Sequence, residues 1–303
     1  MPAELRHAGF VDLWHPGLIA VTLILAVAYL LTVGPWRGRF ADSTAVNGRQ
    51  QTAFFLALST FYLAMGSPMD FLSDHLLMSA HMAEHMMLTF VMAPLLLLGT
   101  PGWLIRPVLL GRPRVRRVVE RLTRPLTAMI VFNVVFSAVH LPGIYDLTLH
   151  NVPLHFTEHA VLIVTALLMW WPVLSPLPEL PRLPDMTQIG YLFLNEVFQT
   201  IAFALITFAD HPLYAVYAGA PQIWGITRMD DQQAGGLLMK LGAMASLVPA
   251  MWDAFFRWAR RESAFRTDFT AVTAAPSARA DTTRTDAPPP SAAAAQAAPA
   301  LRP

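Results

Sequence analysis

The chain has 303 residues, of which 55% are hydrophobic and 14% are charged, whereas an ordinary soluble protein has roughly 25% charged residues. A net charge of +1 excludes a nucleic-acid-binding protein that works through bulk charge, and the absence of cysteine excludes disulfides, thiolate metal sites, iron–sulfur clusters and cysteine nucleophiles. With a mean hydropathy of +0.46, the composition is typical of a multi-span membrane protein.

Apolar runs near the ~20 residues needed to cross a bilayer occur seven times along the chain. None shows the ten-residue alternation of a membrane β-strand, so the predicted fold class is an all-α integral membrane protein with about seven transmembrane helices. The runs lie at about 17–34, 51–67, 82–105, 125–141, 156–175, 188–209 and 235–257.

These runs divide the chain into three parts. Residues 1–16 are predicted to form an external N-terminal segment, and residues 17–262 a seven-helix membrane domain. Residues 263–303 are rich in Ala and Pro and poor in large apolar side chains, which predicts a disordered cytoplasmic tail.

Basic residues predict the orientation of the chain in the membrane. Fifteen arginines lie in the segments after spans one, three, five and seven, whereas the other side has only Arg6 and Arg228. By the positive-inside rule, the N-terminus lies outside and the C-terminus in the cytoplasm. The fifteen are Arg37, Arg39, Arg49, Arg106, Arg112, Arg114, Arg116, Arg117, Arg121, Arg124, Arg182, Arg257, Arg260, Arg261 and Arg266.

The pattern H-x-x-E-H occurs twice, at residues 81–85 and again 74 residues later at 155–159. Each copy opens a span that runs inward from the outer face, and the preceding span runs the other way. Spans two and three therefore form a hairpin that is duplicated in spans four and five. A proline and an aspartate precede each copy at similar distances: Pro68 and Asp70, then Pro142 and Asp146.

Spans six and seven are a candidate third copy of this hairpin. Their outer loop contains Asp210 and His211, and the sequence Asp-Asp-Gln-Gln at 230–233 opens span seven. Acidic and amide groups thus replace the histidine pair there.

Two histidines four residues apart on a helix face the same way, about 6 Å apart, so each pair is able to chelate one metal ion. If the helix of the first copy extends back through Asp74, then His75, Met78 and Met82 share the face of its histidines. Imidazole with thioether and no thiolate suits copper, while imidazole alone also suits zinc or iron.

We expect the two pairs to converge on one outer pocket, because spans three and five have equivalent places in the repeat and two-helix metal sites draw ligands from facing helices. Other histidines and methionines are candidate secondary ligands or an access route, and nearby carboxylates are candidate supports for the ligands. The predicted ligands are His81, His85, His155 and His159, the secondary group is His75, His140, His150, Met78 and Met82, and the supports are Glu84, Glu158, Asp70 and Asp146.

The remaining histidines and the intramembrane charges are less specific. A single histidine at a membrane interface usually places its polar tip among the headgroups, which is the prediction for His7, His15 and His211. Glu196 and Lys240 lie inside predicted spans, where an ionisable group is either functional or the structural partner of a neighbour. The sequence leaves their roles open.

As a set, these motifs resemble the multi-span CtaG-like cytochrome c oxidase assembly factors of the caa3 type, over about residues 15–262. They are the Pro-Met-Asp loop at 68–70, the two H-x-x-E-H copies, the His-Leu-Pro-Gly-x-Tyr-Asp turn at 140–146 and the stretch Asp-Gln-Gln-x-Gly-Gly-Leu-Leu-Met at 231–239. The resemblance implies a bacterial plasma-membrane protein that is not an enzyme and that handles copper for a haem–copper oxidase. It also implies that its partners are oxidase subunits or other assembly factors, and that the four histidines of the H-x-x-E-H copies are functional.

Three other interpretations fit the same residues. H-x-x-E-H is also the inverted zincin motif of metallopeptidases, although one catalytic zinc needs one such motif and a third ligand, not two copies. Bis-histidine haem ligation usually uses histidines that face each other deeper in a bundle. The third is a structural scaffold that uses no metal.

The predicted orientation is tested with reporter fusions. We expect a fusion after Arg117 to be active only with a cytoplasmic reporter and a fusion after Asp146 only with an external reporter, because of the asymmetry of the basic residues. Cytoplasmic activity after Asp146 would contradict the orientation.

Overall fold

The computed structural model describes residues 9–274, and every regular element in that range is helical, which confirms the predicted all-α class there. Residues 1–8 of the predicted external segment and 275–303 of the predicted tail lie outside the described residues. Residues 263–274, predicted to be disordered, continue the last helix. The elements are α2 (Phe10–Trp14), α3 (Pro16–Val33), η1 (Arg37–Arg39), α4 (Gly48–Met65), α5 (Pro68–His75), α6 (Met78–Met86), η2 (Met87–Met92), α7 (Ala93–Gly99), α8 (Gly102–Leu110), α9 (Pro113–Leu122), α10 (Pro125–Val139), α11 (Pro142–Leu149), α12 (Val152–Leu174), α13 (Asp185–Thr207), η3 (Ala215–Tyr217) and α14 (Arg228–Ala274).

Within residues 9–274, five helical stretches are long and apolar enough to cross a membrane: α3, the continuous stretch Met78–Gly99, α12, α13 and the part Arg228–Arg266 of α14. Two bent pairs, α4 with α5 at 43° and α9 with α10 at 76°, bring the number to seven if each pair is one span. The chain is therefore a multi-pass helical protein, and the predicted count of seven depends on these two bends.

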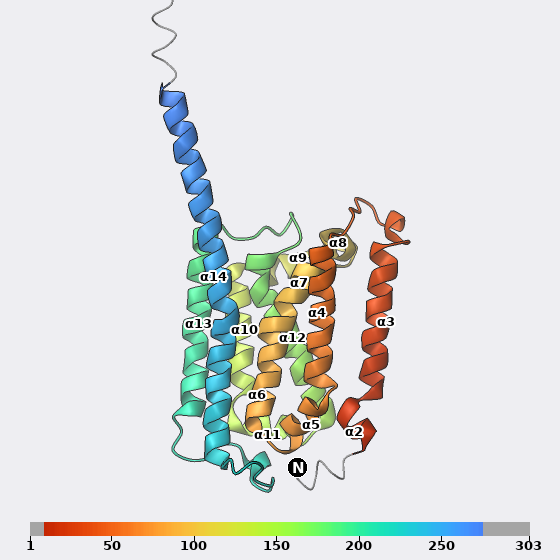
Figure 1. Ribbon diagram of the computed structural model, residues 1–303, viewed down its shortest axis with the longest axis vertical. Helices are drawn as coiled ribbons and strands as arrows, with labels where there is room; N and C mark the ends of the chain where they lie inside the picture. The colour runs from red at the N-terminus through yellow and green to blue at the C-terminus, as the bar shows by residue number, and fades with distance from the viewer. Residues whose placement is uncertain (1–8, 275–303) are drawn as a thin grey trace, which may run out of the picture. The chain divides into compact units, whose positions relative to one another are not determined.

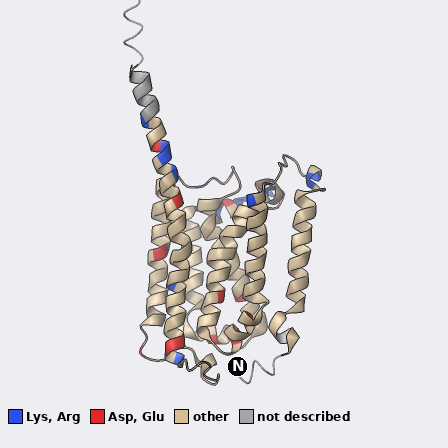
Figure 2. Cartoon of the chain, viewed as in Figure 1, with Lys and Arg blue, Asp and Glu red and all other residues tan. Residues whose placement is uncertain are grey.

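Residues up to Phe255 form one compact unit, and residues from Phe256 onward form a second. Within the first unit, Lys and Arg gather at the end where α8 and α9 lie, whereas α5 and α11 lie at the opposite end (Figures 1 and 2). The asymmetry of basic residues in the sequence thus corresponds to two ends of the bundle. Which end faces outward stays a prediction.

The two H-x-x-E-H hairpins have the same construction. In each, a long helix is followed by an eight-residue helix that starts with a proline, α5 after α4 and α11 after α10. Pro68 and Pro142 suit this first helical position because a helix leaves that N–H unbonded in any case. The next helix then starts at Met78 in one hairpin and at Val152 in the other, so His81 and His155 are each the fourth residue of their helix.

The span that contains the first histidine pair is widened just beyond it. Pro94 has no N–H to donate to the carbonyl of Phe90, and the preceding η2 is a π-helix. The hydroxyl of Ser246 in α14 donates to the Phe90 carbonyl at 2.6 Å, and the indole of Trp170 in α12 donates to the Thr89 carbonyl at 3.0 Å. Neighbouring helices therefore satisfy the carbonyls that the irregular turn frees.

Helix α14 packs closely against α6 through glycines. A Cβ on Gly235 would lie 3.1 Å from Cγ of Met82, and a Cβ on Gly242 would lie 2.8 Å from Cγ of Met86. These contacts place the methionine side of α6 against α14.

At Gly99, helix α7 lies very close to the backbone of α4. A Cβ there would lie 2.4 Å from the backbone nitrogen of Phe54, and the Gly99 carbonyl accepts a hydrogen bond from Tyr29 of α3 at 2.9 Å. We expect Gly99→Ala to lower the free energy of unfolding by about 1–3 kcal/mol, as overpacking does. The measurement is thermal unfolding of the purified protein in detergent.

Gly190 in α13 provides the matched control, since a Cβ there meets nothing within 4 Å. Gly190→Ala should leave the melting temperature unchanged or raise it, because alanine is the better helix former. Equal melting temperatures for the Gly99 variant and the unmodified chain would contradict the prediction.

Candidate metal site

The four histidines of the two H-x-x-E-H copies form one cluster between α6 and α12. The ring centroids of His81 and His85 are 4.4 Å apart, as are those of His155 and His159. Between the two helices, His81 lies 5.3 Å from His155 and His85 lies 5.2 Å from His159. All four side chains are buried. The structure thus brings together the residues that the sequence singles out.

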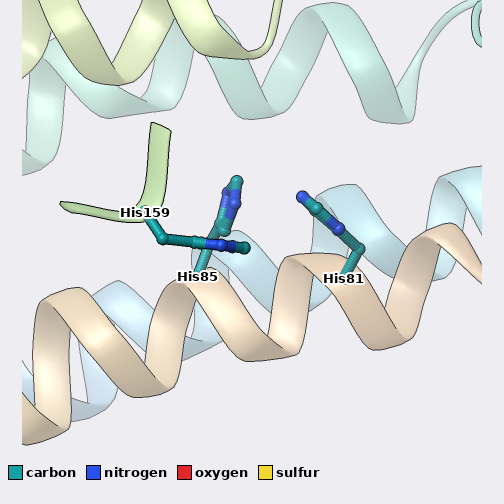
Figure 3. A group of neighbouring side chains, drawn as sticks. All are labelled: His81, His85 and His159. Atoms are coloured by element: carbon teal, nitrogen blue, oxygen red, sulfur yellow. The ribbon is translucent and has the colours of Figure 1, made fainter. Parts of the chain in front are cut away.

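Two groups of three side chains that include histidines are able to hold a metal ion. In each group, one ligand atom from every residue lies within 4.8 Å of the other two. The first group is His81, His85 and His159, whose rings face one space from two helices (Figure 3). The second group is Asp74, His81 and His155. His81 belongs to both.

Many polar atoms in this cluster are buried without a hydrogen bond. They include both ring nitrogens of His81 and one ring nitrogen, Nε2, on each of His85, His155 and His159. An unpaired buried polar atom costs about 1–3 kcal/mol, and native proteins have few of them. A cation coordinated by these nitrogens would satisfy them together, so the residues present fit a metal ion.

The two glutamates face histidines of the opposite copy. Oε1 of Glu84 lies 3.5 Å from Nε2 of His159, and Oε1 of Glu158 lies 3.8 Å from Nε2 of His85. The hydroxyl of Ser73 donates to the other oxygen of Glu84 at 2.7 Å. Each carboxylate is thus placed to support positive charge on or near the opposite helix.

His140 positions the ring of His85. Its Nδ1 lies 2.6 Å from the carbonyl of Phe136, which only accepts, so Nδ1 donates. In the neutral ring Nε2 is then the acceptor, and it faces Nδ1 of His85 at 3.4 Å. Nε2 of His85 then has the free lone pair that a metal needs. Both ring nitrogens of His140 thus have partners, and the ring orients His85.

The other members of the predicted secondary group on α5 and α6 have packing partners of their own. The expectation that the helix extends back through Asp74 is wrong, because α5 ends at His75 and α6 begins at Met78. His75 stacks on Phe71 at 4.8 Å, and Met82 packs against Gly235 of α14. Met78 is buried in the apolar core.

The remaining predicted residues have local partners. Nδ1 of His150 faces the carbonyl of Asp146 at 2.5 Å, and the His150 ring is exposed. The carboxylate of Asp146 accepts the backbone N–H groups of Ala215 and Val216, at 3.2 Å and 3.1 Å, and so caps η3. Neither residue joins the histidine cluster.

Asp74 is the site residue that the sequence does not identify. Its Oδ2 lies 3.6 Å from Nδ1 of His155, and its Oδ1 lies 4.0 Å from Nδ1 of His81. The chain turns at Leu76 and Leu77, between α5 and α6, and this turn returns Asp74 to the histidines. No local sequence signal predicts that turn.

A cleft of about 480 Å³ reaches the cluster from the surface. Asp74, His155 and His159 line the cleft together with His75, a predicted secondary ligand, and Asp70, a predicted support. His15, predicted to be an interfacial residue, also lines it and pairs with Asp70 at 3.0 Å. The histidine and aspartate side chains around the cleft give a cation a polar route to the buried rings.

The polar residues of the third hairpin hold the backbone near the site. Asp231 accepts the N–H of Met78 at 2.7 Å and that of Ser79 at 3.1 Å, and so caps α6 at the start of the first histidine helix. The amide of Gln232 bonds the backbone of Leu213, Ile206 and His211.

Lys240 pairs with Glu196 and with Thr200, which links α14 to α13. Each of the two intramembrane charges is therefore the structural partner of the other, which is one of the two roles that the sequence leaves open.

Fold and site together define a multi-pass helical protein with a buried histidine–carboxylate cluster at one end of its bundle. The chain belongs to the cytochrome c oxidase caa3 assembly factor family (Caa3_CtaG), whose sequence model matches residues 27–261. The family resemblance of the motifs is thereby confirmed.

Two curated relatives are the uncharacterized proteins Mb0105 of Mycobacterium bovis and MT0111 of Mycobacterium tuberculosis. Each is 27% identical over 199 residues, which cover 61% of this chain and 30% of the relative. The chain therefore spans about a third of the length of these relatives. No solved structure matches it.

Proposed function

We propose that this protein binds copper in the four-histidine cluster and supplies it during assembly of a haem–copper cytochrome c oxidase. The observation that carries the proposal is the convergence of unpartnered, buried imidazole nitrogens from two helices on one space. Membership of the caa3 assembly factor family supports the oxidase as the destination.

The donor set supports copper over other cofactors. Imidazole nitrogens bind divalent metals with an affinity that peaks at copper, and the chain has no thiolate to favour a different chemistry. The centroids of neighbouring rings in the cluster are 4.4–5.8 Å apart, so no flat gap remains between the rings for the porphyrin of a bis-histidine haem. In the inverted zincin arrangement one motif holds one zinc, whereas here each glutamate faces the histidine of the other copy.

The different charge of the two ends of the bundle indicates on which side of the membrane copper binds. The arginine-rich end is cytoplasmic by the positive-inside rule, so the histidine end faces outward from the bacterial plasma membrane. Copper then enters from the outer side and passes to an oxidase subunit or to another assembly factor at that side.

Copper affinity of paired variants tests the metal site. We expect His81→Ala/His85→Ala and His155→Ala/His159→Ala each to weaken binding by more than about 100-fold, because loss of even a supporting partner costs 10–100-fold. The fourfold variant should add little, since the residues act as one unit. The measurement is competition with a copper chelator on the purified chain.

His150→Ala is the matched control, because this exposed histidine lies near the same end and bonds only its own helix. It should leave the copper affinity unchanged. Independent, additive losses of one ion for each pair would show two remote sites and contradict the shared cluster. Selective binding of zinc without copper would favour the metallopeptidase interpretation.

Gene deletion tests the destination of the metal. At limiting copper, we expect deletion to lower the copper content and activity of the oxidase while other membrane functions persist, because only oxidase maturation depends on this protein. The unmodified gene should restore both, and the fourfold histidine variant should not. A fully metallated, fully active oxidase in the deletion strain would overturn the assembly role.

A further inference from the structure

We propose that the cluster consists of two successive copper stations that share His81. The outer station is Asp74, His155 and His81, and the inner station is His81, His85 and His159. This inference rests on the proposed function, namely that the cluster binds copper, and adds an order of occupancy and a role for Asp74.

The two stations are geometrically separate. Among the residues that the structure describes, the ligand atoms of the four histidines do not form one compact group: His155 is grouped with Asp74, and His85 is grouped with His159. Each station combines one or two histidines of α6 with one histidine of α12, so neither H-x-x-E-H copy forms a station by itself. His81 is the only histidine in both groups.

The stations differ in their access to water. The side chains of Asp74 and His155 are 27% and 11% exposed, and both line the cleft. In the inner station, the side chains of His81 and His85 are 0% exposed and do not line the cleft, and His159, which does line it, is 3% exposed. An ion that arrives through the cleft therefore meets the outer station first.

The chemistry of the ligands favours inward transfer. The outer station offers a partly hydrated carboxylate, which attracts a cation at a low desolvation cost. The three grouped ligands of the inner station are all imidazoles, with Glu84 and Glu158 facing His159 and His85 as supports, and an imidazole donor set suits copper better. In moving inward the ion exchanges Asp74 and His155 for His85 and His159, with no change in its charge.

His81 is able to serve both stations because no hydrogen bond fixes which of its ring nitrogens is free. Neither nitrogen of His81 has a hydrogen bond, whereas the hydrogen bond from His85 to His140 fixes which nitrogen of His85 is free. A neutral imidazole has one free lone pair, so His81 coordinates a single ion at a time. The stations are therefore filled in sequence, and the chain holds one copper.

The experiment uses Cu(II) as the probe on the full chain in lipid nanodiscs. Electron paramagnetic resonance reports the ligand nitrogens, and stopped-flow fluorescence reports the loading rate. The unmodified protein should hold one ion with three nitrogen ligands. His85→Ala/His159→Ala should keep one weaker ion with two nitrogen ligands and an oxygen, and His81→Ala should lose both forms.

Asp74→Asn tests the order of occupancy. We expect its equilibrium affinity and three-nitrogen spectrum to stay within about twofold of the unmodified protein, while loading slows at least about tenfold, since only the outer station is impaired. Asp70→Asn is the matched control, because Asp70 lines the same cleft and pairs with His15, and its group with Asp74 and Glu84 contains no histidine of either station. It should load within about twofold of the unmodified rate.

Each outcome separates the two proposals. Absence of copper binding by the unmodified chain overturns the proposed function. If that chain binds copper but His85→Ala/His159→Ala, with an unchanged melting temperature, binds none, one undivided site exists and the two-station order is wrong. Equal slowing by the Asp70 and Asp74 variants would show that only the charge of the cleft matters, which also overturns it.

Discussion

The arrangement of this protein depends on the burial of four imidazoles and two carboxylates between two helices of a membrane bundle. Such groups are expensive to remove from water unless they are paired or bind a cation. The surrounding structure offers only partial compensation, through Ser73 on Glu84 and His140 on His85. The polar atoms that remain unpaired converge, and their convergence is what gives the cluster the chemistry of a metal site.

The rest of the fold holds the starts of the two histidine helices in place. Asp231 of α14 caps α6, while Asn151 caps α12 by accepting the N–H of Leu154 at 3.1 Å. Tyr145 contacts the His81 ring at 5.0 Å and shares a hydrogen bond with Tyr217, whose hydroxyl also contacts the Ser73 carbonyl. The third hairpin, Tyr145 and Tyr217 thus hold the cluster in place through backbone hydrogen bonds and packing.

The sequence predicts those features that repeat or that follow helical spacing. Seven apolar runs and two H-x-x-E-H copies are enough to predict the helical class and the face shared by His81 and His85. The turn at Leu76 and Leu77 could not be predicted, because no proline or glycine lies there and the break depends on Asp231, 154 residues after Leu77. For that reason the sequence does not point to Asp74, and it cannot reveal that Met82 packs against Gly235 on a distant helix.

The duplication also explains why the cluster has two unlike halves. The hairpins match at a constant offset of 74 residues from Pro68 to His85, so His81 corresponds to His155 and His85 to His159. A perfect copy would make two equivalent pairs with no direction between them. The copies differ where Asp74 corresponds to Thr148, which removes one carboxylate from the outer side, and where His140 corresponds to Gly66, which gives only His85 a supporting ring. These two differences make one part of the cluster more accessible, with Asp74 among its grouped ligands, and the other part buried, with three imidazoles, which is the asymmetry that the proposed order of occupancy requires.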